Sequence, residues 1–375
     1  MAILAHLRRH IGIYGFLAVW LAAFCFRNAI AERDMRSLQQ ATQSDFAPFL
    51  VESAMMYGYI QKAAAGEAIG GVDPELPAMA NYTVSEQMSL GLEYAGGGLL
   101  QLRRWLCGMP ERGVYEDSAA ESRLVRLALT LHLALVPALV FVLLLVLGVP
   151  WPLAVAGALI ETFSAAALGR YTGQDLLKGA FAFPFLMAYL TAKASAERRR
   201  PVWILAGMFC AAFLAVASWD AAQLLIGALG VLEIIRLAGG GMASRKRRDV
   251  WLLTYLALAL AAVLLPYNRV HGAFFSPVIQ FVLPGCWLLN WLRFDRHSGL
   301  KRLAVLAALA VAALLAMRLS PFAGNYSHFG DLLSAKVRFL NRLPADPTQL
   351  TFDQRFLWTP ELHSADWRLT GMIFP

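Results

Sequence analysis

The sequence predicts an all-α polytopic membrane protein with about nine transmembrane helices and a large helical first extracytoplasmic loop. Composition is the first observation behind this prediction: hydrophobic residues make up 58% of the 375 residues and charged residues only 15%. Soluble domains have roughly 45–50% apolar and about 25% charged residues. The second is that the apolar residues collect in runs long enough to cross a bilayer. The third is that clusters of lysine and arginine separate these runs.

This composition also excludes several classes of protein. A disordered chain and an ordinary soluble enzyme are both less apolar. The four cysteines include no CxxC pair, so neither a disulfide framework nor a structural zinc site is supported. We interpret the formal charge of +8 as membrane topology, because the basic clusters lie between apolar runs. The expected partner is therefore the lipid bilayer and not a nucleic acid.

Each predicted span is an apolar segment of about 20 residues. The segments are 10–29, 124–148, 151–169, 176–194, 201–218, 221–238, 250–266, 274–292 and 302–319. Basic clusters precede the first segment and follow the fourth, sixth and eighth, so a count of nine places all four clusters on one side. The positive-inside rule then places the N-terminus in the cytoplasm and the C-terminus outside.

Residues 1–319 are expected to form the transmembrane domain, including the extracytoplasmic loop 30–123, and residues 320–375 an extracytoplasmic C-terminal segment. The first span could instead be a signal peptide, because Ala29–Ala31 resembles a cleavage site. The chain stops in a newly apolar stretch, Met372–Pro375, which makes truncation one of the expectations. The composition suggests a bacterium, and hence the plasma membrane.

The first loop is expected to contain two helices that lie on the outer membrane surface. Apolar residues from Phe46 to Ile60 recur at spacings of three and four, with Ser44–Asp45 at the position of a cap. A second helix is expected from Thr83, where Thr83-x-x-Glu86 matches a capping box. The three glycines at 96–98 are expected to interrupt that helix.

Ionisable residues gather around the short second outer loop, 169–175. Asp175 lies near the outer end of the fourth segment, Lys178 one turn deeper, and Glu161 inside the third segment. Burying a charged side chain at such depth costs free energy, so these residues usually face the bundle interior. We therefore expect Asp45, Asp175 and Glu161 to converge at one outward-facing cavity, with Lys178 and Glu161 as buried support. Structural alternatives are a helix cap for Asp45, complementation of a helix dipole for Asp175, and a Glu161–Lys178 ion pair.

Three stretches then carry a resemblance to a known family. They are Ser44–Leu50, the tyrosine-rich Met56–Ile60 with the following Gly66–Pro74, and Arg170–Asp175 followed by Phe181–Pro184. In these stretches the chain resembles the GT-C class of membrane glycosyltransferases, particularly oligosaccharyltransferase catalytic subunits and their uncharacterised bacterial relatives. The likeness covers roughly residues 10–200.

The resemblance implies a polyprenyl-phosphate-linked sugar donor and chemistry at the outer membrane face, often with a divalent metal such as Mg or Mn. Asp45 would be the catalytic carboxylate of the first loop and would bind the metal together with Asp175. Gln174 stands where a second acid is expected beside Asp175, and the W-W-D-Y-G signature is missing. Peptide glycosylation is therefore not supported.

A lipid phosphate that leaves with negative charge needs cationic contacts. Arg170, Arg269 and His271 are the expected contacts, because they lie in short outer loops. Arg269 could instead snorkel to headgroups, and His271 could be an interfacial residue. The function expected is an integral membrane glycosyltransferase. The alternatives are a transporter or flippase for a lipid-linked substrate, and a non-catalytic subunit that binds a lipid carrier.

Overall fold

The described part of the protein is mostly helical. The computed structural model describes residues 2–43, 49, 52–73, 83–108, 119–164, 168, 175–198, 201–294 and 297–319, with short pieces between 335 and 350. These residues contain one isolated bridge, between Val72 and Thr83, and no strand. The prediction of an all-α fold is confirmed.

The elements in chain order are α1 (Ala2–Thr42), α2 (Glu52–Ala64), α3 (Val84–Gln87), α4 (Gly91–Leu106), α5 (Ala119–Leu133), α6 (Leu135–Leu147), α7 (Trp151–Phe163), α9 (Lys178–Arg198), α10 (Val202–Ser218), α11 (Ala222–Ala238), α12 (Arg245–Leu264), α13 (Pro266–Val270), η2 (Ala273–Phe275), η3 (Val278–Val282), α14 (Leu283–Trp291), α15 (Gly299–Leu319) and η5 (Pro347–Gln349).

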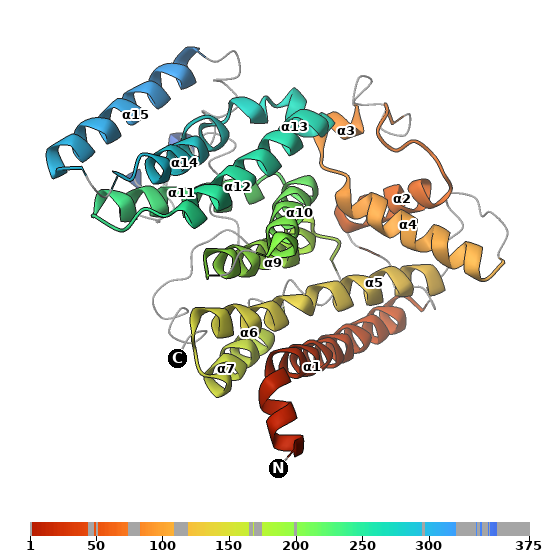
Figure 1. Cartoon of the computed structure of the whole chain (residues 1–375). Coiled ribbons are helices and arrows are strands. Elements are labelled where there is room, and N and C mark those ends of the chain that lie inside the picture. Colours follow the sequence, from red (N-terminus) through yellow and green to blue (C-terminus); the bar gives the residue numbers. More distant parts are fainter. Residues whose placement is uncertain are drawn as a thin grey trace.

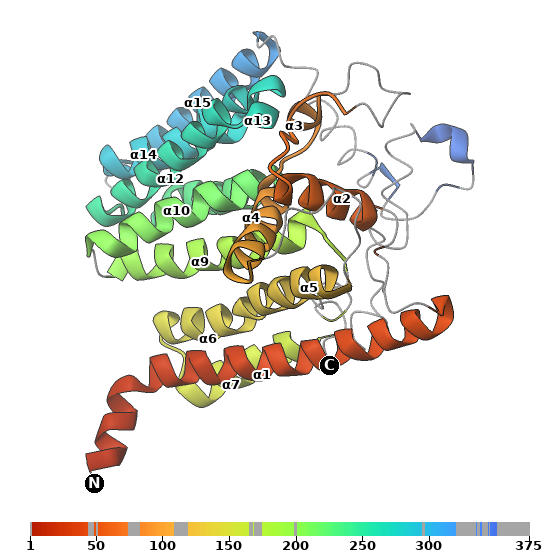
Figure 2. The same ribbon diagram turned by 90° about the vertical axis from the view of Figure 1, so that its right-hand side faces the viewer.

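The long helices stack in approximate chain order (Figures 1 and 2). α1 and α7 pack against α6, and α6 packs against α9. α10 lies between α9 and α12, α14 packs on α12, and α15 contacts α11. The largest apolar core joins α9, α10, α12 and α14. Helices α2, α3 and α4 lie together beside the ends of the stacked helices (Figure 1).

Two described helical segments are long and apolar enough to cross a membrane. They are Gly12–Thr42 of α1 and Ala119–Leu147, which combines α5 and α6. Three shorter apolar helices are Trp151–Phe163, Val202–Ser218 and Val278–Trp291. Each of the nine predicted segments contains a helix. That all nine cross a membrane stays a prediction.

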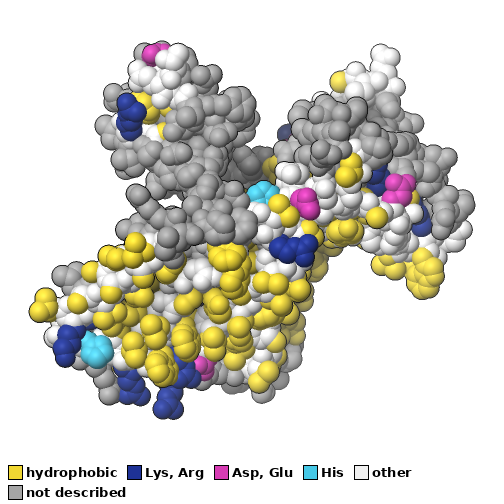
Figure 3. All heavy atoms as spheres, turned by 90° about the horizontal axis from the view of Figure 1, so that it is seen from above, with side chains coloured by type: hydrophobic (Ala, Val, Ile, Leu, Met, Phe, Trp, Pro, Cys, Tyr) yellow, Lys and Arg dark blue, Asp and Glu magenta, His cyan; other side chains and the backbone are white. Residues whose placement is uncertain are grey.

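Apolar side chains cover much of the molecular surface. Figure 3 shows one face on which hydrophobic side chains form a broad continuous area, with lysine and arginine side chains gathered toward one end. Exposed large residues include Leu300, Val311 and Leu315 of α15 and Trp203 of α10. Water-exposed surfaces of monomeric proteins rarely carry so large an apolar area.

A helix begins directly after Thr83, as predicted, but its predicted length, its capping box and its interruption at 96–98 are wrong. Only Val84–Gln87 is helical after Thr83, and the Thr83 side chain makes no capping bond. The amides of Val84 and Ser85 instead donate to the carbonyls of Gly71 and Gly70. The turn is thus held by the preceding loop, and the long helix α4 begins only at Gly91.

The three glycines at 96–98 do not interrupt α4, which is continuous through them. They lie where α4 crosses α2. A Cβ at Gly97 would lie 2.6 Å from the Cβ of Ala63, and one at Gly96 would lie 2.9 Å from Cδ1 of Ile60. Gly96 and Gly97 therefore permit close helix packing, which outweighs the low helix propensity of glycine.

Candidate functional site

A buried arginine lies on α5, in the part that shares a core with α2, α4 and α9. Arg126 of α5 is only 2% exposed, and its guanidinium lies 3.8 Å from the centre of the Phe49 ring. Asp175 and Tyr57 lie close enough to interact electrostatically with the guanidinium. We call Arg126, Phe49, Tyr57 and Asp175 the Arg126 cluster. Asp175 is its exposed member, so the cluster joins a buried cation to a carboxylate that faces solvent.

The position of Asp175 follows from the packing of α2 against α5 and α9. Leu176 is fully buried in a core shared by these helices and by Phe49 and Tyr57. Its backbone amide donates to the hydroxyl of Ser53 on α2 at 3.0 Å. Because Leu176 is fixed on both counts, the carboxylate of its neighbour Asp175 is held at the edge of the Arg126 cluster.

The cluster brings together the ends of two predicted site segments. Phe49 follows Asp45 by four positions, and Asp175 ends the stretch that contains Arg170. Asp45 and Arg170 themselves lie outside the described residues. Two stretches that are more than 120 residues apart in the chain therefore approach the same guanidinium, Phe49 by ring contact and Asp175 by electrostatic interaction.

The described residues do not make a metal site. No group of three His, Cys, Asp or Glu side chains with the geometry of a metal site occurs among them. Asp175 is the only described member of the predicted pair, and the charge beside it is the Arg126 guanidinium. A divalent cation prefers several oxygen ligands and is repelled by a neighbouring cation. The metal prediction thus depends on Asp45, which is not described.

Lys178 does not pair with Glu161, so this structural alternative is wrong. Its ammonium lies 3.2 Å from a carboxylate oxygen of Glu93 and also donates to the carbonyl of Ser89. Glu93 is fully buried on α4, and Lys178 begins α9. This ion pair therefore fastens α4 of the first loop to the helix stack.

Glu161 pairs instead with Arg27 of α1. The two side chains are joined at 2.9 Å, and that of Arg27 is fully buried. The Arg27 guanidinium also donates to the carbonyl of Leu133 at 2.9 Å. Pro137 has no amide hydrogen to offer the carbonyl four residues earlier, so the Leu133 carbonyl is released from the helix. The pair ties α1 and α7 to this break between α5 and α6. Glu161 is therefore not part of the Arg126 cluster and does not converge with Asp175.

Arg269 and His271 lie in a different part of the structure, on α13 and directly after it. α13, which contains Arg269, packs against α12 and α3, and Arg269 is exposed. The His271 ring stacks on Tyr267 with centres 4.3 Å apart, and its Nδ1 lies 2.9 Å from the Tyr267 carbonyl. Neither residue belongs to the Arg126 cluster. A pocket of about 270 Å³ beside them is lined by Tyr267, Asn268 and residues at the start of α4.

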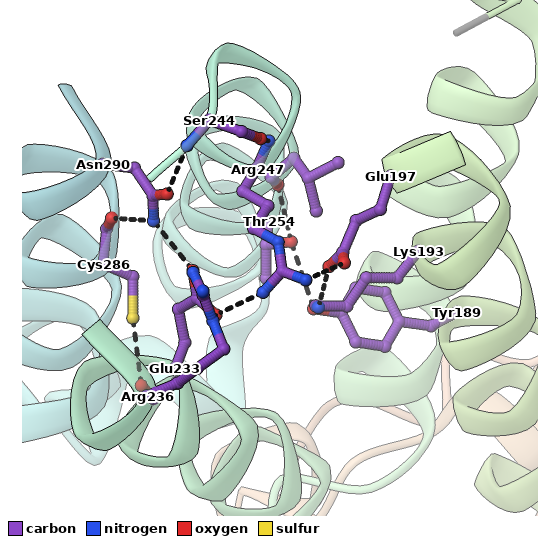
Figure 4. Close-up of polar contacts among 12 residues, drawn as sticks. Tyr189, Lys193, Glu197, Glu233, Arg236, Ser244, Arg247, Thr254, Cys286 and Asn290 are labelled. Carbon is purple, nitrogen blue, oxygen red and sulfur yellow. Dashed lines mark hydrogen bonds and ion pairs between the residues drawn. The ribbon is translucent and has the colours of Figure 1, made fainter. Parts of the chain in front are cut away.

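A second charged cluster joins residues near the ends of α9, α11 and α14 and the start of α12 (Figure 4). Glu233 of α11 accepts hydrogen bonds from Arg236, Arg247 and Asn290. Arg247 of α12 also lies 3.2 Å from Glu197 of α9. Four helices, α9, α11, α12 and α14, are thus joined by one network, in which the opposite charges are paired. Arg247 belongs to one of the basic clusters used to predict the topology, and here its charge is directed into the bundle.

Sequence reasoning missed Arg126 and Arg27. Arg126 lies within the predicted span 124–148, and Arg27 within the span 10–29. An ionisable residue inside an apolar segment usually faces the bundle interior with a partner. That signal was available for both arginines, but the identity of the partners was not.

No protein-family model matches the sequence, and a search of curated proteins found no match to it.

Proposed function

We propose that this protein is an integral membrane glycosyltransferase that transfers a sugar from a polyprenyl-phosphate-linked donor to an acceptor at the outer membrane face. The main support is that Phe49 and Asp175, at the ends of two segments with the family resemblance, both interact with Arg126, Phe49 by ring contact and Asp175 electrostatically. The exposed apolar helices favour a membrane location. Under this proposal the nine segments span the membrane, with the N-terminus in the cytoplasm and the Arg126 cluster outside.

The proposed reaction is a displacement at the anomeric carbon of the donor sugar. A carboxylate accepts the proton of the acceptor hydroxyl, whose oxygen then bonds to the anomeric carbon. The bond between that carbon and the phosphate oxygen breaks, and the lipid phosphate leaves with the electron pair. Asp45 is the proposed base, from the resemblance. Asp175 is the second carboxylate, and Arg126 supplies positive charge near it.

Arg126 is proposed as a positioning residue. Its guanidinium is buried under Phe49 and Tyr57, so it acts on the reaction through Asp175. No step is assigned to a metal ion, because the described part of the site offers a cation beside Asp175 and no further ligand.

The test is sugar transfer in membranes from radiolabelled polyprenyl-phosphate donors. We expect Asp45→Asn and Asp175→Asn each to lower transfer by about 10²-fold or more. Asp34→Asn is the matched control, since Asp34 is an exposed carboxylate on α1 that pairs only with its neighbour Arg33 among the described contacts. Transfer that persists in both site variants at equal expression would remove these residues from the mechanism.

A second arm of the same assay adds EDTA. Because Arg126 already supplies positive charge beside Asp175, we expect transfer to continue. Complete loss in EDTA with recovery in Mg or Mn would instead support a metal held by Asp45 and Asp175. Uptake or lipid translocation without sugar transfer would favour a transporter or flippase. Lipid binding with neither activity would favour a non-catalytic subunit.

A further inference from the structure

Two adjoining pockets lie between α1, α4 and α5. The first has a volume of about 640 Å³ and is lined mainly by leucines: Leu99, Leu102 and Leu106 on α4, and Leu124 and Leu127 on α5. Their spacings of three and four place one row of leucines on each helix. The walls thus form a single apolar trough between two helices.

The second pocket is polar and has a volume of about 470 Å³. Its lining includes Arg36 and Gln39 of α1 and Ser122 of α5. Glu32 and Arg123 line both pockets, so they mark the junction between the apolar trough and the polar pocket. Both volumes lie in the range of small-molecule sites, about 300–1,000 Å³.

The charges at this junction favour an anion. Arg36, Arg103 and Arg123 line one or both pockets, whereas Glu32 is the only acidic residue among the described lining residues. Arg123 binds Glu32 through contacts of 2.8 and 2.9 Å, but its side chain is 64% exposed. An exposed ion pair of this kind contributes little to stability. A phosphate can therefore take the place of the Glu32 carboxylate on Arg123 without loss of the fold.

We infer that these two pockets bind a lipid phosphate with one apolar chain: the chain lies in the leucine trough, the phosphate on Arg123, and a polar head group in the second pocket. A single trough with one row of leucines per wall fits one chain better than the two chains of a bilayer phospholipid. Arg123 precedes Arg126 on α5 by three residues, a rise of ~4.5 Å. The phosphate on Arg123 would therefore lie within about one helical turn of Arg126 along α5, and the inference rests on the proposed function in so far as this lipid is the donor.

Equilibrium binding of farnesyl phosphate to the purified full chain tests this inference without any transfer reaction. We expect Arg123→Gln to weaken binding by at least about tenfold, because it removes a charge-assisted contact. Glu32→Gln should leave affinity unchanged or raise it, because it removes the competing anion. Arg33→Gln, at an exposed arginine of α1 outside both pockets, is the matched control and should bind as the native chain does.

The free cysteines give a second readout. Cys107 is exposed and lines the apolar trough, whereas Cys210 is exposed on α10. Bound farnesyl phosphate should slow alkylation of Cys107 and leave that of Cys210 unchanged. Farnesol and inorganic phosphate, which each supply half of the ligand, should protect Cys107 less than farnesyl phosphate at the same concentration.

Two outcomes would overturn the inference. One is equal loss of binding in Arg123→Gln and Glu32→Gln, since a merely structural ion pair is broken by either change. The other is equal protection by phosphatidylglycerol, which would assign the pockets to a bilayer phospholipid. Binding with these variant effects but no sugar transfer would retain the site and remove the proposed function. Sugar transfer that needs Asp175 but is insensitive to Arg123→Gln would retain the proposed function and remove this lipid site.

Discussion

Arg27 and Arg126 each place a guanidinium inside the helix stack beside groups from distant parts of the chain. Arg27 joins α1 to Glu161 of α7 and to the carbonyl of Leu133. Arg126 joins α5 to Phe49 and lies near Asp175. A buried charge that loses its partner is costly, so both sites allow sharp predictions.

Breaking the Arg27–Glu161 pair should destabilise the fold. We expect Arg27→Met to lower the free energy of unfolding by about 3 kcal/mol, because Glu161 is left without its counter-ion. The double variant with Glu161→Leu should lose less than the sum of the two single changes. The measurement is unfolding in detergent, with Arg33→Gln of the exposed Arg33–Asp34 pair as a control expected to change stability by under about 1 kcal/mol. Strict additivity of the two changes would argue against a coupled pair.

Changes at Arg126 should separate charge from geometry. Arg126→Gln is expected to lower the rate of sugar transfer by about 10²-fold, because Asp175 loses its neighbouring cation. Arg126→Lys keeps the charge, although not the planar fork, and should recover part of that loss. Equal stability of the two variants, checked by thermal unfolding, assigns the difference to the reaction. Equal transfer rates in Arg126→Gln and Arg126→Lys would show that the charge of Arg126 has no role.

At the residue scale, the sequence predicted that charges within apolar segments turn inward, and Glu161 and Lys178 do so. It did not predict their partners. Glu161 and Lys178 are close in the chain, and spacing alone favours pairing them. The carbonyl released by Pro137 and the buried Glu93 of α4 decide otherwise, and both depend on which helices become neighbours.

At the scale of elements, α2, which carries Tyr57 of the Arg126 cluster, packs against α4, and this contact depends on glycine. A Cβ at Gly97 would approach the Cβ of Ala63 to 2.6 Å, whereas one at Gly98 would meet nothing within 4 Å. The sequence indicated a loop with apolar helices. It misplaced the break at 96–98, because a glycine that weakens a helix and one that lets two helices touch look alike in a sequence.

The two glycines form a matched pair for experiment. Gly97→Ala should destabilise the protein by about 1–3 kcal/mol, because the new methyl group forces α4 away from α2. Gly98→Ala should be neutral or stabilise by up to about 1 kcal/mol, because alanine favours the helix. Unfolding of both variants by denaturant gives the comparison. A neutral Gly97→Ala would mean that α2 and α4 are not in close contact.

At the scale of the whole molecule, composition predicted the helical class, and each predicted segment contains a helix. The stacking order of these helices was not predictable, because hydropathy reports burial in an apolar phase and not the neighbours of each helix. The orientation of the chain in a membrane remains a prediction from the basic clusters.

Cysteine labelling tests that orientation. In a chain whose four native cysteines are replaced by serine, we expect Val72→Cys to react with an impermeant maleimide in intact cells. Met242→Cys should react only after the membrane is opened. Both positions are exposed, at 55% and 79%, so access to the reagent and not burial decides the result. Labelling of Met242→Cys in intact cells would contradict the nine-span topology.

The central claim is that the Arg126 cluster serves sugar transfer from a lipid phosphate. The most direct measurement is the transfer rate of the purified protein in proteoliposomes with a polyprenyl-phosphate-linked sugar, compared between Asp175→Asn and Asp34→Asn. We expect a loss of about 10²-fold in Asp175→Asn and a native rate in Asp34→Asn. A native rate in Asp175→Asn, or no transfer by the native chain with any donor, would contradict it.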